Sequence, residues 1–308
     1  AFKEDCYQAY KTTANDILLT ALGKSINEVF DIQVTSVLLE GHGREELFEN
    51  VDVSRTVGWF TALYPFVLDI KKTTETVGLR TNWVRVKEDL RQIPNKGIGY
   101  GLLEYSGDYS EPIVCDIIFN YLGEFNENND GAVDLFQFSE LEHGSPIASE
   151  NDALGAKLSV SGIIVKGKLS INLRFKSGTF ESEKIKQLNS AYQYKLETII
   201  SQLSEQNEVY QTPSDYSYTK LSIEEYERLI QEYSVEDVYL MSPMQQGFYF
   251  HWLQDRKSQT YFGQKAFGIH GSNLDLDKVK RSFESLICLL YTSPSPRDLS
   301  TSRMPSSA

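Results

Sequence analysis

The sequence predicts a mixed α/β protein, and three patterns support that class. Apolar residues recur at helical spacing from Thr13 to Phe30 and again from Ile185 to Leu203. From Leu158 to Lys176, apolar and polar residues alternate on both sides of a central Lys-Gly pair, which is typical of a β-hairpin with one buried face. Short apolar runs at Gln33–Leu39 and Pro112–Phe119 predict two more strands, the second apolar on both faces and hence buried.

The other elements of this region follow in chain order. Val51 to Ile70 is expected to be extended chain, and Val84 to Gln92 a short charged helix that Pro94 ends. The glycine-rich run from Gly97 to Gly101 lacks the Lys-Ser/Thr of a nucleotide-binding P-loop. We therefore expect it to form a tight turn beside a substrate channel.

A break in composition follows the last amphipathic helix, and we place a linker from Gln206 to Val235. Within it, Ser222 and Glu225 form a predicted capping box that starts a short helix.

A second predicted helix start lies beyond the linker, where Ser242, Pro243 and Gln245 combine an N-cap, a first-position proline and a capping box. Gln264 to His270 then predicts a strand, and Leu274 to Ile287 a helix. Four apolar side chains of the Pro243 helix are expected to lie in a core: Met244, Phe248, Tyr249 and Trp252.

Composition limits the classes of function. The 308 residues carry a net charge of −13, which argues against a nucleic-acid partner, and no apolar run reaches membrane-spanning length. Cys6 and Cys115 are too few and too scattered for a disulfide framework, so we expect a cytoplasmic protein. Cys115 lies in an apolar run and is expected to be a buried thiol rather than a nucleophile.

Five blocks carry a resemblance to a known family. They are Asp16–Gly23 (DILLTALG), Leu39–Glu45 (LEGHGRE), Ser54–Pro65 (SRTVGWFTALYP), Pro94–Gly101 (PNKGIGYG) and Phe119–Gly123 (FNYLG). In this order they resemble the epimerization domain of nonribosomal peptide synthetases, which inverts the α-carbon of an aminoacyl or peptidyl thioester held on a carrier protein. The resemblance implies a chloramphenicol-acetyltransferase-like (condensation-type) α/β sandwich, in which two similar lobes enclose a channel.

The same resemblance implies the partners. The substrate would enter on the phosphopantetheine arm of a peptidyl carrier domain, no cofactor would be bound directly, and adenylation and condensation domains would be neighbours. The family's first lobe carries a paired-histidine motif. The four histidines here, His42, His143, His251 and His270, are never adjacent, so we expect the chain to begin after that lobe.

The resemblance also sets the expected domains. Residues 1–205 would be the second lobe of an epimerization domain and residues 206–235 a linker. Tyr239 to His251 resembles the opening motif of a condensation domain, so residues 236–287 would begin one. Residues 288–308 are Ser/Pro-rich, resemble translated sequencing-adaptor sequence, and are interpreted as non-native and disordered.

Glu40 is the first candidate for chemistry, as the base or acid that moves the Cα proton. It follows an apolar strand and precedes Gly41, which places it at a pocket rim where partial burial would raise its pKa. The alternative is a surface or salt-bridged glutamate.

The other candidates also have structural alternatives. Asn120 and Tyr121 would follow a buried strand, and Tyr121 would contact the developing enolate or orient the base; it could equally be an aromatic anchor. Arg55 would pair with Glu40 or with substrate, or form a structural ion pair. His42 is expected to fix its loop with Arg44 rather than to bind a metal.

Two other functions remain open at this point. One is a condensation domain, which forms a peptide bond; the other is a non-catalytic docking module of the same fold. The acidic loop from Glu40 to Glu45 and the Gly58-Trp59-Phe60 block favour epimerization.

Overall fold

The computed structural model describes residues 5–70, 75–107, 113–125, 155–257 and 274–292, apart from 166, 177 and 207, and five isolated residues between 260 and 268. It divides into two compact units, one up to Leu240 and one from Met241 on. Within the described ranges, no helix has the length and apolar character needed to cross a membrane.

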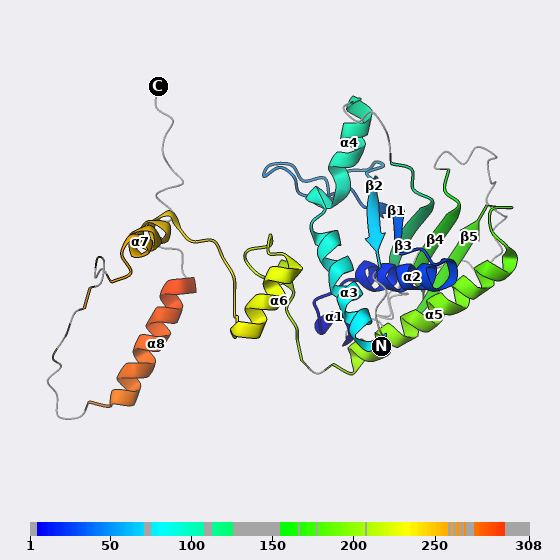
Figure 1. The fold of residues 1–308 in the computed structure, drawn as a ribbon. Helices are drawn as coiled ribbons and strands as arrows, with labels where there is room; N and C mark the ends of the chain where they lie inside the picture. Colours follow the sequence, from blue (N-terminus) through cyan, green and yellow to red (C-terminus); the bar gives the residue numbers. More distant parts are fainter. Residues whose placement is uncertain are drawn as a thin grey trace, which may run out of the picture. The chain divides into compact units, whose positions relative to one another are not determined.

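The elements lie in the following chain order (Figure 1): α1 (Asp5–Gln8), α2 (Ala14–Phe30), β1 (Val34–Gly41), β2 (Ala62–Asp69), α3 (Glu75–Arg91), η1 (Pro94–Gly97), α4 (Ile98–Ser106), β3 (Ile117–Phe125), β4 (Leu158–Val165), β5 (Lys168–Phe175), α5 (Ser182–Ser204), η2 (Pro213–Asp215), α6 (Ile223–Glu232), α7 (Pro243–Gln254) and α8 (Leu276–Thr292).

The first unit is built on a mixed five-stranded sheet. Its strand order is β2-β1-β3-β4-β5. The central pairs β1–β3 and β3–β4 are parallel, whereas β2 and β5 pair antiparallel at the two edges. In the parallel pair of β1 and β3, Leu39 lies opposite Phe119, so the last residues of β1 lie beside the middle of β3.

Helices cover one face of this sheet (Figure 1). Leu18 and Leu22 of α2 pack with Leu188 and Tyr192 of α5 over the apolar side chains of the strands. The strands alternate accordingly, and β4 buries every second residue. The opposite face carries Ser36, Leu38 and Glu40 of β1. We call it the open face of the sheet, a name that refers only to the residues that the structure describes.

Helix α2 begins and ends at clear signals. The Asp16 carboxylate accepts a hydrogen bond from the Thr13 backbone N–H at 2.7 Å, and Asp31 closes the helix with φ +59°. The predicted helix from Thr13 to Phe30 and the hairpin from Leu158 to Lys176 are both confirmed. Cys6 and Cys115 are both buried and are not joined in a disulfide, and burial raises the pKa of Cys115, as expected of a non-nucleophilic cysteine.

Several predicted elements differ in extent. The strand expected over Pro112–Phe119 is β3, Ile117–Phe125, so it starts later and runs past Asn120 and Tyr121. The predicted run is also not buried throughout, because Ile113 and Val114 within it are exposed. Helix α3 starts at Glu75 rather than Val84.

The glycine-rich run from Gly97 to Gly101 was expected to be a tight turn, and that expectation is wrong. After η1 the chain continues as helix α4, with Gly97 as its N-cap and Gly99 and Gly101 inside it. The region from Val51 to Ile70 is a strand only from Ala62 on.

Two short helices follow α5 within the first unit. The predicted capping box of α6 is confirmed, since the Ser222 hydroxyl accepts from the Glu225 N–H and the Glu225 carboxylate accepts from the Ser222 N–H. Helix η2 (Pro213–Asp215) lies in the segment expected to be a linker, and its N-cap Thr212 is only 1% exposed.

The second unit is described through α7 and α8. The capping box of Ser242 and Gln245 and the first-position Pro243 are confirmed. The expected core side chains of α7 are exposed: Met244, Phe248, Tyr249 and Trp252. The described part of this unit contains little beyond two helices, which is too little structure to enclose a core.

Helix α8 continues to Thr292, so Cys288 to Thr292 are helical and not disordered as expected. The apolar residues Leu289 and Leu290 extend the preceding helical pattern, which explains the difference. The expected strand Gln264–His270 and the tail from residue 293 on lie outside the described residues, apart from isolated positions.

Candidate active site

Glu40 lies on the open face of the sheet, one residue before β1 ends. Val37 and Leu39 of the same strand are buried against the helices. Because successive side chains of a strand point to opposite faces, Glu40 points away from this core. It is nevertheless half-buried, since Leu63 of β2 lies directly opposite it in the antiparallel pair.

Asn120 of β3 holds the Glu40 carboxylate. The Asn120 amide Nδ2 donates a hydrogen bond to Glu40 Oε2 at 2.5 Å. Burial raises the pKa of Glu40 above its ordinary value, and the Asn120 hydrogen bond opposes part of that rise. A carboxyl group with a raised pKa is suited both to accept and to return a proton near neutral pH.

The polar character of this face continues across the next strands. Asn120 pairs with Ser161 of β4, and Ser161 pairs with Asn172 of β5. All three share the face of Glu40, so a polar row crosses the open face. The sequence interpretation did not select Ser161 and Asn172, although the alternation of the hairpin already placed both on its polar side.

Tyr121 does not lie beside Glu40. It follows Asn120 in β3, points to the helix-covered face and packs against the hydrophobic core. A Cβ atom added at Gly162 of β4 would lie 3.4 Å from the Tyr121 ring. Burial raises the pKa of Tyr121, so its hydroxyl stays protonated.

The loop after Glu40 is fixed by its own charged side chains. His42 Nδ1 accepts a hydrogen bond from the Arg44 backbone N–H at 3.0 Å, and His42 Nε2 lies 3.0 Å from Glu45 Oε1. The other Glu45 oxygen, Oε2, pairs with Lys96 Nζ at 3.0 Å. The expectation that His42 and Arg44 organise this loop is therefore confirmed, with Glu45 and Lys96 as additional partners.

These loop residues line a hollow of about 500 Å³ together with Asn95 and Ile93. Asn95 and Lys96 both have left-handed backbones, with φ of +47° and +50°. Such conformations cost energy in residues other than glycine and concentrate at functional sites.

The chain then returns toward β2 along a second loop. Gly43 has φ +63°, and a Cβ atom there would lie 1.6 Å from the Phe60 carbonyl oxygen, so only glycine fits. The Arg44 guanidinium stacks on the Phe60 ring at 4.1 Å and donates a hydrogen bond to the Val53 carbonyl. Arg55 lies on the exposed part of this loop, and no contact between its guanidinium and Glu40 is found.

The donor set does not point to a metal. Among the described residues, no group of three or more His, Cys, Asp or Glu side chains is arranged to hold an ion. In the loop, the His42 imidazole pairs with the Glu45 carboxylate, which also pairs with Lys96.

Comparison with known proteins identifies the family to which this chain belongs. Residues 2–222 match the family model of the condensation domain. Bacitracin synthase 3 of Bacillus licheniformis is 38% identical over 271 residues, which are 86% of this chain and 4% of that protein. Gramicidin S synthase 1 of Brevibacillus brevis is 38% identical over 231 residues, which are 71% of this chain and 21% of that protein.

The comparison with solved structures includes one that is similar in both fold and sequence. The epimerization domain from the third module of tyrocidine synthetase B superposes with a TM-score of 0.55 and 35% identity, over 65% of this chain and 44% of that domain. The likeness confirms the condensation-type α/β fold that the sequence predicts.

Proposed function

The chain belongs to the condensation-domain family, and from this premise we propose that it is part of a nonribosomal peptide synthetase and inverts the α-carbon of an aminoacyl or peptidyl thioester. The 35% identity to an epimerization domain supports this subtype. The chain spans 4% and 21% of the two curated relatives and 44% of that domain. The activity is therefore proposed for the larger domain that contains this chain.

The observation that carries the proposal is the half-buried Glu40 carboxylate, held by Asn120 on the open face of the sheet. Inversion requires that the Cα–H bond breaks, that the electron pair moves into the thioester carbonyl as an enolate, and that a proton returns to the other face of Cα. Glu40 is the proposed base for one face and the acid for the same face in the reverse direction. Groups in this role contribute roughly 10²–10⁴-fold to rate.

Asn120 has two parts in this proposal. One N–H of its amide orients the Glu40 carboxylate. The amide carries a second N–H, which can donate to the enolate oxygen as charge develops there.

Tyr121 and Arg55 are proposed to act indirectly. Tyr121 anchors β3 to the helix-covered core and so fixes Asn120, its neighbour in the strand. Arg55 lies on an exposed loop, where its charge is available to a substrate or a carrier domain.

The partners follow from the same proposal. The substrate would arrive as a thioester on the phosphopantetheine arm of a peptidyl carrier domain, and no cofactor of the chain's own enters the reaction. Adenylation and condensation domains are the proposed neighbours, and residues 236–287 are proposed to begin a condensation domain.

The test is Glu40→Gln in the complete domain, assayed with both L- and D-aminoacyl thioesters on a carrier. We expect Cα proton exchange into heavy water to fall by at least about 10²-fold in one stereochemical direction, because the amide cannot accept the proton. Glu46→Gln is the matched control, since it removes the same charge from an exposed position of the same loop. Wild-type exchange with both substrates would remove Glu40 from the mechanism.

Peptide-bond formation is the second candidate, because the matching family model is that of the condensation domain. The same assay separates the two if an acceptor carrier loaded with a second amino acid is added. A dipeptide thioester formed without Cα exchange would identify a condensation domain. The absence of both the dipeptide and Cα exchange would identify a docking module.

A further inference from the structure

We propose that residues 210–216, which we call the strap, dock specifically on α3 and on the turn at Ala9–Tyr10 and are not a flexible tether. Lys87 and Glu88 of α3 recognise the sequence Thr-Pro-Ser-Asp and hold this segment in place within the first unit. This inference is independent of the reaction that the domain catalyses.

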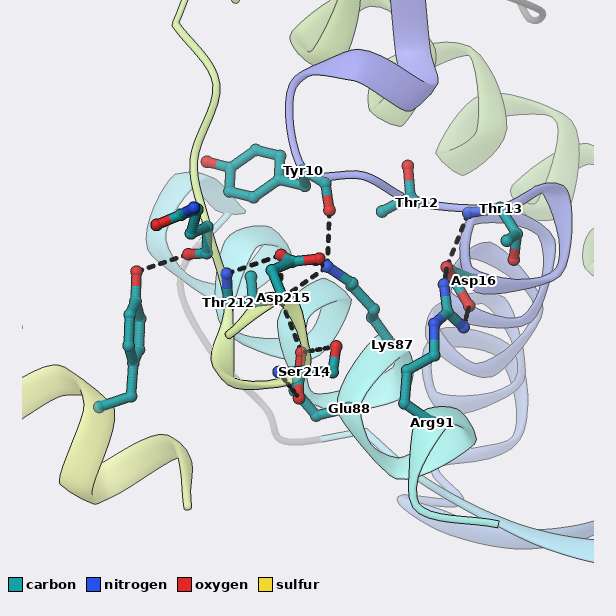
Figure 2. Close-up of polar contacts among 12 residues, drawn as sticks. Tyr10, Thr12, Thr13, Asp16, Lys87, Glu88, Arg91, Thr212, Ser214 and Asp215 are labelled. Carbon is teal, nitrogen blue, oxygen red and sulfur yellow. Dashed lines mark hydrogen bonds and ion pairs between the residues drawn. The ribbon is translucent and has the colours of Figure 1, made fainter. Parts of the chain in front are cut away.

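Lys87 of α3 is the centre of the recognition (Figure 2). Its side chain is 1% exposed, and Nζ donates to the Tyr10 carbonyl at 2.8 Å, to Thr212 Oγ1 at 2.7 Å and to Asp215 Oδ2 at 2.7 Å. An ammonium group has three N–H donors. All three are used, two of them on the strap.

Glu88, the next residue of α3, also forms hydrogen bonds with the strap (Figure 2). It is 2% exposed, and its carboxylate accepts from the Thr212 hydroxyl at 2.6 Å, the Ser214 backbone N–H at 2.8 Å and the Ser214 hydroxyl at 2.9 Å. Hydrogen bonds to a buried carboxylate are strong and directional, so they select both the side chain and the backbone of Ser214.

Thr212 joins the two recognising residues. Its hydroxyl accepts a hydrogen bond from Lys87 and donates one to Glu88, a combination that neither an apolar nor a charged side chain provides. Pro213 follows in the first position of η2, where its fixed φ favours the turn that brings Asp215 back to Lys87.

Further contacts hold both ends of the strap. Before Thr212, the Tyr210 N–H donates to the Ala9 carbonyl at 2.7 Å, and the Tyr210 ring stacks on Tyr10 with centroids 5.1 Å apart. After the strap, the Tyr218 N–H donates to the Val238 carbonyl at 2.7 Å. This bond joins the residues just after the strap to a segment close to the end of the first unit at Leu240.

Helix α3, on which the strap docks, is itself bonded to α2. One turn beyond Lys87, Arg91 forms a bidentate pair with the buried Asp16 of α2 at 3.0 and 2.7 Å (Figure 2). The receptor residues are thus held in place by α2. Burying one ammonium and two carboxylates is unfavourable unless every partner is present, so docking is expected to be all-or-none.

The test is hydrogen exchange of the strap amides in the full chain, with Thr212→Val as the main variant. Valine keeps the shape of threonine but leaves Lys87 and Glu88 each without one buried partner. We expect the amides of Tyr210, Thr212, Ser214 and Asp215 to be protected in the wild type. In Thr212→Val they should exchange at least about tenfold faster, whereas the amides of α2 keep their rates.

Three further variants complete the test. Thr212→Ser keeps the hydroxyl and should retain wild-type protection. Lys87→Met should release the strap more completely than Thr212→Val, and Lys195→Met is its matched control. The latter breaks the remote Lys195–Glu28 pair of 2.7 Å and should leave the strap protected.

Comparing the strap with α2 separates local release from general unfolding. If Lys87→Met unfolds the whole unit, Thr212→Val still decides the question. Strap amides that exchange freely in the wild type, or that stay protected in Thr212→Val, would overturn the proposal.

Discussion

The carboxyl group of Glu40 occupies a position where burial opposes its negative charge. Its pKa is raised by burial and only partly lowered by Asn120. The folded state therefore binds a proton more tightly than the unfolded chain does, and the stability of the fold decreases as pH rises through the interval between the two pKa values. A cost to stability of this kind is expected if Glu40 is the base that we propose.

Glu40→Gln should therefore not destabilise the chain at pH 7, although it abolishes the proposed base. The glutamine is nearly isosteric, its oxygen can still accept from Asn120, and it carries no charge to desolvate. Urea unfolding should show the variant at least as stable as the wild type at pH 7, with a smaller difference at pH 4, where the wild-type carboxyl is largely protonated. A stability loss at pH 7 larger than at pH 4 would show that the carboxylate charge stabilises the fold.

Single residues also show where sequence interpretation reached its limit. The motif predicted Glu40 and its raised pKa, because an acid after an apolar strand and before glycine is a recognisable pattern. It did not separate Asn120 from Tyr121, since both were thought to follow the strand. Only the actual extent of β3 shows that the two side chains point to opposite faces.

At the level of elements, η1 requires a glycine at position 97, whereas helix α4 does not require the glycine at position 99. Gly97 has φ +83°, and a Cβ atom there would lie 2.1 Å from the Tyr64 ring, whereas a Cβ atom at Gly99 in α4 would meet nothing within 4 Å. Gly97→Ala should therefore destabilise the first unit by more than about 1 kcal/mol, from backbone strain and steric clash together.

Gly99→Ala is the matched control, and it should stabilise α4 by up to about 1 kcal/mol because alanine favours the helix. Urea unfolding of the two variants should show opposite signs. Equal effects would mean that Tyr64 moves aside and that η1 is not held by this contact.

Regular elements were largely predictable, whereas irregular ones were not. Helix α2 and the β4–β5 hairpin repeat one pattern over many residues, so their periodicity was sufficient to identify them. The Gly97–Gly101 run was misread, because glycine lowers helix propensity, yet α4 forms with Gly97 as its N-cap. The docking of Thr212 was not predictable, since it depends on Lys87 and Glu88, more than 120 residues away in the chain.

At the scale of the whole molecule, the first unit combines a sheet covered on one face with a candidate site on the other. The hydrophobic core lies between the sheet and helices α2 and α5. The open face carries the proposed chemistry of Glu40 and Asn120. The first unit can therefore form its core on one face of the sheet and present the proposed proton-transfer group on the other.

We expect this chain alone to have no epimerase activity, even when it is folded. Inversion needs a second proton-transfer group on the face of Cα opposite to Glu40, and the resemblance to epimerization domains implies that a histidine pair in the preceding lobe provides it. The chain matches 44% of the solved epimerization domain, and none of its histidines are adjacent. A carrier-bound aminoacyl thioester in heavy water should therefore exchange its Cα proton at the rate seen without protein. The complete domain, assayed in parallel, should exchange it faster by several orders of magnitude. Exchange by the chain above background, abolished by Glu40→Gln, would contradict this expectation and show that one carboxylate on an open sheet is sufficient to remove the proton.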